Sequence, residues 1–187
     1  APAIALLESE GFKVVVPDGL FEAENQLAGN DKHRAAQIVE LLKSDEVKAI
    51  LFARGGYGSV RTLQHIPSSL FTSNPKWIIG YSDITVFHSF LSKLGIESIH
   101  ATMPINFPKE GGHNQSTHSL ISTLKGFHDA IAVPFHPGNV FGKVRGILTG
   151  GNLSVLYSLA ATPIDLIPEG RILVIEDLDE YLYHIDR

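Results

Sequence analysis

The chain has 187 residues, of which 44% are hydrophobic and 19% charged, enough for a sizeable core in one domain or in one domain and part of another. Its formal net charge of -5, without a run of Lys or Arg, argues against nucleic acid and anionic membrane surfaces as partners. The absence of cysteine excludes disulfides, thiolate metal sites and a cysteine nucleophile.

No segment of the sequence approaches the roughly 18 consecutive apolar residues that a membrane helix needs. The N-terminus also lacks a basic segment followed by an apolar core. We therefore expect a soluble, cytoplasmic protein. None of the nine histidines has a metal-binding spacing such as His-Glu-x-x-His. The leading hypothesis developed below implies neither a metal nor an organic cofactor.

Short apolar runs alternate with amphipathic segments along the chain. In order, they predict a helix over residues 3–10, a strand over 12–16, a helix over 31–44, a strand over 47–53, a short helix over 60–65, a strand over 77–80, a helix over 83–94, a strand over 96–101 and a helix over 117–125. Because the chain opens inside a helix, we expect that a first strand is missing. The alternation is typical of crossover units, so we predict an α/β fold: a parallel sheet with helices on both faces.

Residues 134–143 are rich in Pro, Gly, His and Asn, which is the composition of a linker. Beyond them we predict a strand over 145–148, a helix over 153–160 and a strand over 172–175. This tail is too short to be a domain of its own. We therefore predict an α/β domain over residues 1–135, followed over 136–187 by the linker and the start of a second, truncated domain.

A serine stands between a predicted strand and a predicted helix in the segment Gly-Tyr-Ser-Asp-Ile, residues 80–84. This is the position of a nucleophile elbow, in which the hydroxyl of Ser82 is presented at the end of a parallel strand and the next backbone N–H stabilises an oxyanion. The usual elbow has glycine two residues after the serine, whereas this chain has Ile84. The alternative is that Ser82 only caps the following helix.

A glycine-rich loop, Arg-Gly-Gly-Tyr-Gly at residues 54–58, follows the strand predicted over 47–53. Such a loop can point N–H groups at a carboxylate, a phosphate or a developing oxyanion. It is neither a dinucleotide fingerprint nor a P-loop, because the spacing of both motifs is absent. A tight strand-to-helix turn is the alternative.

Two further candidates lie near the end of the chain. Asn152 follows Gly-Gly before a predicted helix, where it could cap the helix or hold a substrate amide or carboxylate. Glu176 and Asp177 end a strong apolar strand, which is where a triad acid that orients a histidine can be held in a fixed position. A metal site from this pair is disfavoured, because neighbouring strand residues point to opposite faces.

Among the histidines, His100 is the one best placed to line a cleft, since it lies near the end of the strand predicted over 96–101. A histidine satisfied by backbone hydrogen bonds is the simpler interpretation of this residue. The acids Asp179, Glu180 and Asp186 are interpreted as solvated surface residues or salt-bridge partners.

Taken together, these segments resemble the motif set of the LD-carboxypeptidase family of serine peptidases, which includes the microcin C immunity peptidases. The resemblance covers the Gly-rich loop at 53–58, Pro-Lys-Trp-Ile-Ile-Gly-Tyr-Ser-Asp-Ile-Thr at 75–85, Gly-Gly-Asn-Leu at 150–153, Ala-Thr-Pro at 161–163, and Glu-Asp at 176–177 with residues 183–187. Each motif is weak alone, and their common order and spacing carry the signal.

The resemblance implies that Ser82 is the nucleophile and Glu176 the triad acid. It implies an oxyanion hole from the backbone amides of Asp83, Gly55 and Gly56, and a substrate contact from Asn152. It also implies a homodimer that cleaves, in the cytoplasm, the amide bond between an L-configured centre and terminal D-alanine of muropeptide tetrapeptides during peptidoglycan recycling.

Two departures from the family pattern affect these expectations. His100-Ala101-Thr102-Met103 stands where many members have Gly-Pro before the methionine, which leaves the pocket shape there open. The family's catalytic histidine lies downstream of the triad acid, beyond Arg187, so we expect this chain alone to be inactive. The alternatives are a microcin-type immunity peptidase and a non-catalytic module that binds a carboxylate or phosphate ligand.

Overall fold

The structure is a computed structural model that describes residues 2–127 and 130–186. Its helices are α1 (Pro2–Ser9), α2 (Asp31–Lys43), α3 (Ser59–Leu63), α4 (Ser68–Ser73), α5 (Thr85–Lys93), α6 (Gln115–Leu124), α7 (Leu153–Leu159) and α8 (Leu182–Asp186), with short 3-10 helices η1 (Ser82–Ile84) and η2 (Pro104–Asn106). Its strands are β1 (Ala49–Leu51), β2 (Trp77–Gly80), β3 (Ile99–His100), β4 (Leu148–Asn152) and β5 (Ile172–Glu176). Within these described ranges no helix is long and apolar enough to cross a bilayer.

The N-terminal part is built on a parallel sheet with the strand order β1-β2-β3. The register pairs Leu51 with Ile79 and Gly80 with His100. Because the strands are parallel, their carboxyl ends meet at one edge of the sheet, where α/β folds place their functional groups. The glycine-rich loop after β1 and the serine after β2 therefore reach the same edge.

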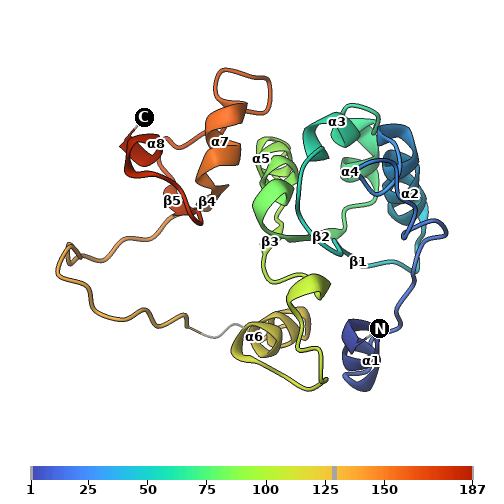
Figure 1. Ribbon diagram of the computed structural model, residues 1–187. Coiled ribbons are helices and arrows are strands. Elements are labelled where there is room, and N and C mark those ends of the chain that lie inside the picture. Colours follow the sequence, from blue (N-terminus) through green and yellow to red (C-terminus); the bar gives the residue numbers. More distant parts are fainter. Residues whose placement is uncertain (1, 128–129, 187) are drawn as a thin grey trace.

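Helices cover both faces of this sheet, as the sequence predicts (Figure 1). Ile78 is fully buried in a core with α2, α3, α4 and α5, whereas the next residue, Ile79, is fully buried in a second core with α1 and α6. Successive strand residues point to opposite faces, so one apolar run can serve two cores. The mixed α/β fold with a parallel sheet is thus confirmed.

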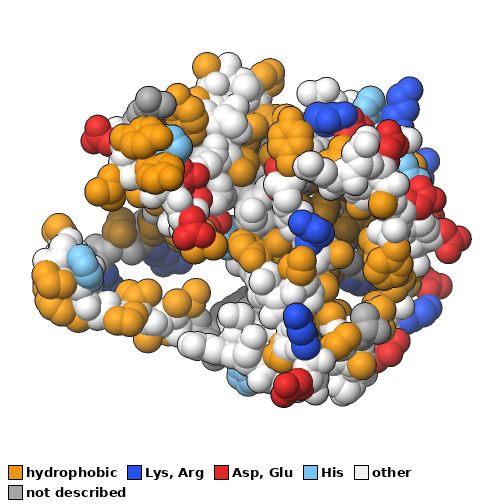
Figure 2. Space-filling view, in the orientation of Figure 1, with side chains coloured by type: hydrophobic (Ala, Val, Ile, Leu, Met, Phe, Trp, Pro, Cys, Tyr) orange, Lys and Arg blue, Asp and Glu red, His pale blue; other side chains and the backbone are white. Residues whose placement is uncertain are grey.

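The C-terminal part contains a second parallel sheet of β4 and β5, connected through α7. It packs on the N-terminal end of α5, where Gly151 lies against Thr85. Residues 130–147 contain no helix or strand, and they form an extended arm that loops away from the rest of the molecule (Figure 1). Hydrophobic side chains line this arm, including Phe135 and Phe141, which are 71% and 83% exposed (Figure 2).

Two strand predictions are wrong. Residues 12–16 have no strand structure, because an apolar run forms a strand only where its N–H and C=O groups pair with a neighbour, and no described strand lies along it. The strand predicted over 145–148 begins only at Leu148 and continues through the glycines to Asn152. Helix α4 was not predicted, because its six residues show no helical period although Phe71 anchors it in the core.

Candidate active site

Ser82 follows β2 directly and begins the short helix η1. Its φ of 60° lies in the left-handed region, where a non-glycine residue costs on the order of 1 kcal/mol. A nucleophile elbow holds its serine in a sharp, strained strand-to-helix turn of this kind. The hydroxyl does not cap a helix, since no hydrogen bond among the described residues involves Ser82 Oγ.

Gly80 and Ile84, which flank Ser82 in the sequence, pack against each other. A Cβ on Gly80 would lie 2.8 Å from Cγ1 of Ile84, whose side chain is 2% exposed. The isoleucine that replaces the usual second glycine of the elbow therefore fills the space left by the first. Only glycine at position 80 accommodates this packing.

The glycine-rich loop after β1 lies against Ser82. A Cβ on Gly55 would be 3.1 Å from Cβ and 3.2 Å from Oγ of Ser82, so the loop backbone approaches the hydroxyl closely. Gly56 has a φ of 124°, which L side chains rarely adopt. None of the hydrogen bonds among the described residues begins at the backbone N–H of Gly55, Gly56 or Asp83. Among the described residues these three N–H groups are thus unpaired, and unpaired N–H groups of a glycine-rich loop can bind an anion.

The Asp83 side chain joins the elbow to the helix that follows the glycine-rich loop. Its Oδ2 accepts a hydrogen bond from the backbone N–H of Ser59 at 2.8 Å, in a buried position. Helix α3 begins after Gly58, which has no side chain to cap it. The carboxylate therefore caps α3 from a different part of the chain, and a negative charge is favourable at a helix N-terminus.

Thr85 connects the elbow to the second sheet. This residue is fully buried, and its Oγ1 accepts a hydrogen bond from the backbone N–H of Asn152 at 2.9 Å. A Cβ on Gly151 would lie 2.5 Å from the same oxygen, and a Cβ on Gly150 would lie 1.8 Å from the carbonyl oxygen of Val174. The two glycines therefore let β4 approach both α5 and β5 more closely than any other residue would permit.

Asn152 is engaged within the protein. Its Oδ1 caps α7 by accepting from the N–H of Val155 at 3.1 Å, and its Nδ2 donates to Oδ1 of Asp177 at 3.1 Å. Asp177 also accepts from the backbone N–H and the hydroxyl of Ser154. Burial opposes the charge of Asp177, but these hydrogen bonds and one from the N–H of Leu178 outweigh it and lower the pKa of the carboxyl.

Glu176 pairs in register with Asn152 across the second sheet. Its Oε1 lies 3.9 Å from Nε2 of His100 at the end of β3, and this oxygen is buried without a hydrogen bond. Asp177, which follows the last residue of β5, contacts Asn152 and Ser154 instead. No three metal-binding side chains cluster anywhere in residues 2–127 and 130–186.

His88 of α5 contacts Gly80, the last residue of β2 before the turn at Ser82. Its Nε2 lies 2.9 Å from the carbonyl oxygen of Gly80 and its Nδ1 lies 2.8 Å from the hydroxyl of Ser98. A carbonyl only accepts, so the ring carries its proton on Nε2. Burial lowers the pKa of His88 to about 4, and the ring is therefore neutral near pH 7.

The structure brings Gly55 and Asp83 close to Ser82. Asn152 and Glu176 lie on the paired strands β4 and β5. The hydrogen bond from Asn152 to Thr85 connects these strands to α5, the helix that follows Ser82. In the described part of the chain no hydrogen bond joins Ser82 to Glu176. Residues 183–186 of the last motif belong to α8, and residue 187 lies outside the described residues.

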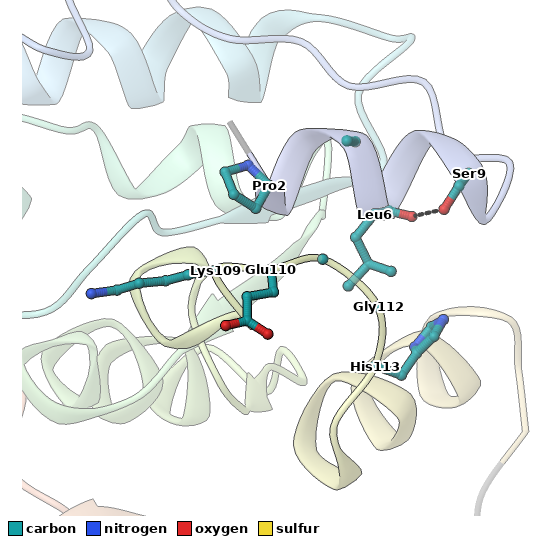
Figure 3. A pocket seen from close by; sticks show the side chains of 9 residues that line it. Pro2, Leu6, Ser9, Lys109, Glu110, Gly112 and His113 are labelled. Atoms are coloured by element: carbon teal, nitrogen blue, oxygen red, sulfur yellow. Dashed lines mark hydrogen bonds between the residues drawn. The ribbon is translucent and has the colours of Figure 1, made fainter.

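Sequence reasoning did not find the contacts of Thr85 and Asp177 or the approach of His100 to Glu176. The signal for Thr85 was a polar residue among apolar neighbours in an amphipathic helix, which indicates a buried hydrogen bond. A hollow of about 510 Å³ between α1 and residues 109–113 contains none of the candidate residues (Figure 3). Leu6 faces the loop at Gly112 there.

The chain matches two family profiles. Residues 1–101 match the LD-carboxypeptidase N-terminal domain, and residues 145–187 match the LD-carboxypeptidase C-terminal domain. It is 35% identical, over 99% of its own length and 59% of the relative's, to a probable murein peptide carboxypeptidase of Bacillus subtilis.

Solved structures agree with the profiles. The chain is similar to a muramoyltetrapeptide carboxypeptidase from Oxalobacter formigenes, with a TM-score of 0.84 and 28% identity over 99% of this chain and 62% of that one. It is also similar to MccF in complex with glutamyl sulfamoyl guanosine, with a TM-score of 0.78 and 25% identity over 94% of this chain and 62% of that one. The chain thus spans less than two thirds of the relatives that it matches, and it belongs to the LD-carboxypeptidase family.

Proposed function

We propose that the protein is a serine carboxypeptidase in which Ser82 attacks the amide carbonyl of a peptide substrate. The observation that carries this proposal is the left-handed backbone of Ser82 directly after β2, with Gly55 against its side chain. A capping serine needs no such strain, whereas an elbow requires it to present the hydroxyl. Strain that persists beside free backbone donors is typical of an active site.

In the proposed reaction, a histidine takes the proton of Ser82 Oγ as the oxygen attacks the carbonyl carbon. Glu176 orients this histidine and stabilises its charged form. The N–H groups of Gly55, Gly56 and Asp83 hold the oxyanion of the tetrahedral intermediate. The histidine then gives its proton to the leaving amine, and water releases the acyl-enzyme by the same steps.

The family resemblance supports a base histidine downstream of residue 187. Serine is a poor nucleophile at neutral pH without a general base, so the 187-residue chain alone should not hydrolyse a muropeptide appreciably. A protein extended through that histidine should do so. Robust turnover by the 187-residue chain would refute this assignment of the base.

The proposed substrate is a muropeptide tetrapeptide that is cleaved before its terminal D-alanine, in peptidoglycan recycling. The names of the Bacillus subtilis and Oxalobacter formigenes proteins support this class. The two matched segments support a division into a domain with the nucleophile, 1–135, and one with the acid, from 136 onward. A cytoplasmic location and a homodimer rest on the family resemblance alone and stay predictions.

The test is release of D-alanine from a murein tetrapeptide by the full-length protein. Ser82→Ala and Glu176→Gln should each lower kcat by roughly 10⁴-fold or more, as losses of triad members do. The exposed residues Ser73 and Glu97 provide matched controls, Ser73→Ala and Glu97→Gln, which should leave the rate unchanged. Unchanged rates in either active-site variant would remove that residue from the mechanism.

A second candidate is a microcin-type immunity peptidase with the same machinery and a different pocket. The similarity to MccF bound to glutamyl sulfamoyl guanosine favours it. Comparing kcat/KM for a murein tetrapeptide and an aminoacyl sulfamoyl nucleoside distinguishes the two. Labelling with a serine-directed fluorophosphonate tests the third alternative, a module that only binds a carboxylate or phosphate. Such a module would not react at Ser82.

A further inference from the structure

We propose that His100 is a positioning residue for Glu176, and that its ring Nε2–H donates a hydrogen bond to the buried oxygen Oε1 of the carboxylate. The proposal rests on the function given above, because it takes Glu176 as the acid that orients the catalytic histidine. It concerns a histidine that is already in this chain and is distinct from that base.

The position of Oε1 carries the argument. This oxygen is buried and accepts no hydrogen bond among the described residues, although Glu176 as a whole keeps 37% of its side chain exposed. A buried oxygen of a carboxylate without a donor is costly, so a donor within reach is expected to be used. Nε2 of His100 is 3.9 Å away, and closing this gap by about 1 Å gives an ordinary hydrogen bond.

The backbone holds His100 where it can do this. Strand β3 pairs His100 with Gly80, two residues before the nucleophile, and the N–H of Ala101 donates to the carbonyl of Gly80 at 3.1 Å. The backbone of His100 is therefore fixed relative to the elbow, and its ring Nε2 lies 3.9 Å from Glu176 on β5. It forms a link between the sheet that carries Ser82 and the sheet that carries Glu176.

The charge state of His100 suits a donor. Burial lowers the pKa of the ring, and the nearby Glu176 carboxylate partly opposes this effect. The other titratable rings that face it are His88, at 5.8 Å between ring centroids, and Tyr81, at 6.2 Å. A neutral imidazole still has one N–H to donate, which leaves the second oxygen of Glu176 for the base histidine.

The kinetic test uses the full-length protein and the variants His100→Phe and His100→Gln. Phe keeps a ring but removes the donor, whereas the Gln side chain presents an N–H at the reach of Nε2. We expect His100→Phe to lower kcat by about 10- to 100-fold with KM within about twofold, because a loosely held acid misplaces the base. His100→Gln should recover most of the loss. The control is His113→Phe, which removes an equivalent contact to Glu10, at 2.9 Å, on an exposed surface.

Wild-type kcat in His100→Phe would overturn the proposal. Equal losses in the Phe and Gln variants would also overturn it, because the ring itself would then be needed.

A second measurement does not depend on turnover. The ring of His100 is titrated by NMR in the wild-type protein and in Glu176→Gln, where loss of the carboxylate should lower its pKa further. An unchanged pKa would overturn the contact. If the pKa shifts but the wild-type protein releases no D-alanine, the contact stands and the proposed function fails.

Discussion

The carboxylate of Asp83 and the backbone N–H of Ser59 meet at 2.8 Å in a buried position, and this contact joins the turn at Ser82 to the helix that follows the glycine-rich loop. The residue after the serine thus has two tasks. Its backbone N–H donates no hydrogen bond among the described residues and is available for the proposed oxyanion hole, while its side chain holds the helix that follows the glycine-rich loop. The turn at Ser82 and the glycine-rich loop are therefore joined by one residue.

Replacing Asp83 by Ala should destabilise the protein by about 1–3 kcal/mol, because it leaves the N–H of Ser59 buried without an acceptor. Asp83→Asn keeps an acceptor oxygen and should cost less. The measurement is the free energy of unfolding in urea. Asp18, which is exposed, gives the control variant Asp18→Ala, which should change it by less than about 0.5 kcal/mol. Equal stability of Asp83→Ala and the wild-type protein would contradict the contact.

Replacing Gly150 by Ala should disrupt the pairing of β4 with β5, because the new Cβ would lie 1.8 Å from the carbonyl oxygen of Val174. Gly126 is the matched control. It also has a positive φ, 85°, but a Cβ there would meet nothing within 4 Å. Gly126→Ala should therefore show only the conformational cost, about 1 kcal/mol. Thermal unfolding curves measure the stability of the two variants. A similar loss of stability in Gly150→Ala and Gly126→Ala would argue against the close approach of β4 to β5.

His88 should make the protein less stable in acid. The unfolded chain takes up a proton near the ordinary histidine pKa of about 6.5, whereas the folded ring does so only near the lowered value of about 4. The unfolded state therefore binds more protons between these values, and stability falls as the pH drops from about 6.5 to 4, by about 3 kcal/mol from this group. Below pH 4 its contribution is constant.

The measurement is the free energy of unfolding as a function of pH for the wild-type protein and His88→Gln. The variant does not titrate at this position, so its curve should be flatter over this window. An NMR titration of the His88 ring should also give a folded-state pKa near 4. A pKa near 6.5 would show that the ring is not held neutral by burial.

The sequence predicted what depends on local pattern. Strand β2 was predicted with its observed limits, because three apolar residues followed by a glycine fit a buried central strand. The turn at Ser82 followed from the change of pattern at Gly80. The role of Ile84 did not follow, since a missing second glycine is explained only when its side chain is seen to fill the space beside Gly80.

Contacts between distant segments were beyond reach of the sequence. Asn152 was given two alternatives, and the structure shows the helix cap together with a bond to Asp177, which needs β4 and β5 to be paired. The approach of His100 to Glu176 joins two sheets and has no local signal. The strand expected over residues 12–16 failed for the same reason, because pairing depends on a neighbour elsewhere in the chain.

The two-stranded sheet has a consequence for handling the protein. In the described part of the chain, β4 and β5 pair only with each other, so each leaves one edge with unpaired backbone groups. Leu173, Val174 and Ile175 are also about half exposed on β5. Open strand edges flanked by apolar side chains act as templates for further strands. A preparation of these 187 residues alone should therefore self-associate as its concentration rises.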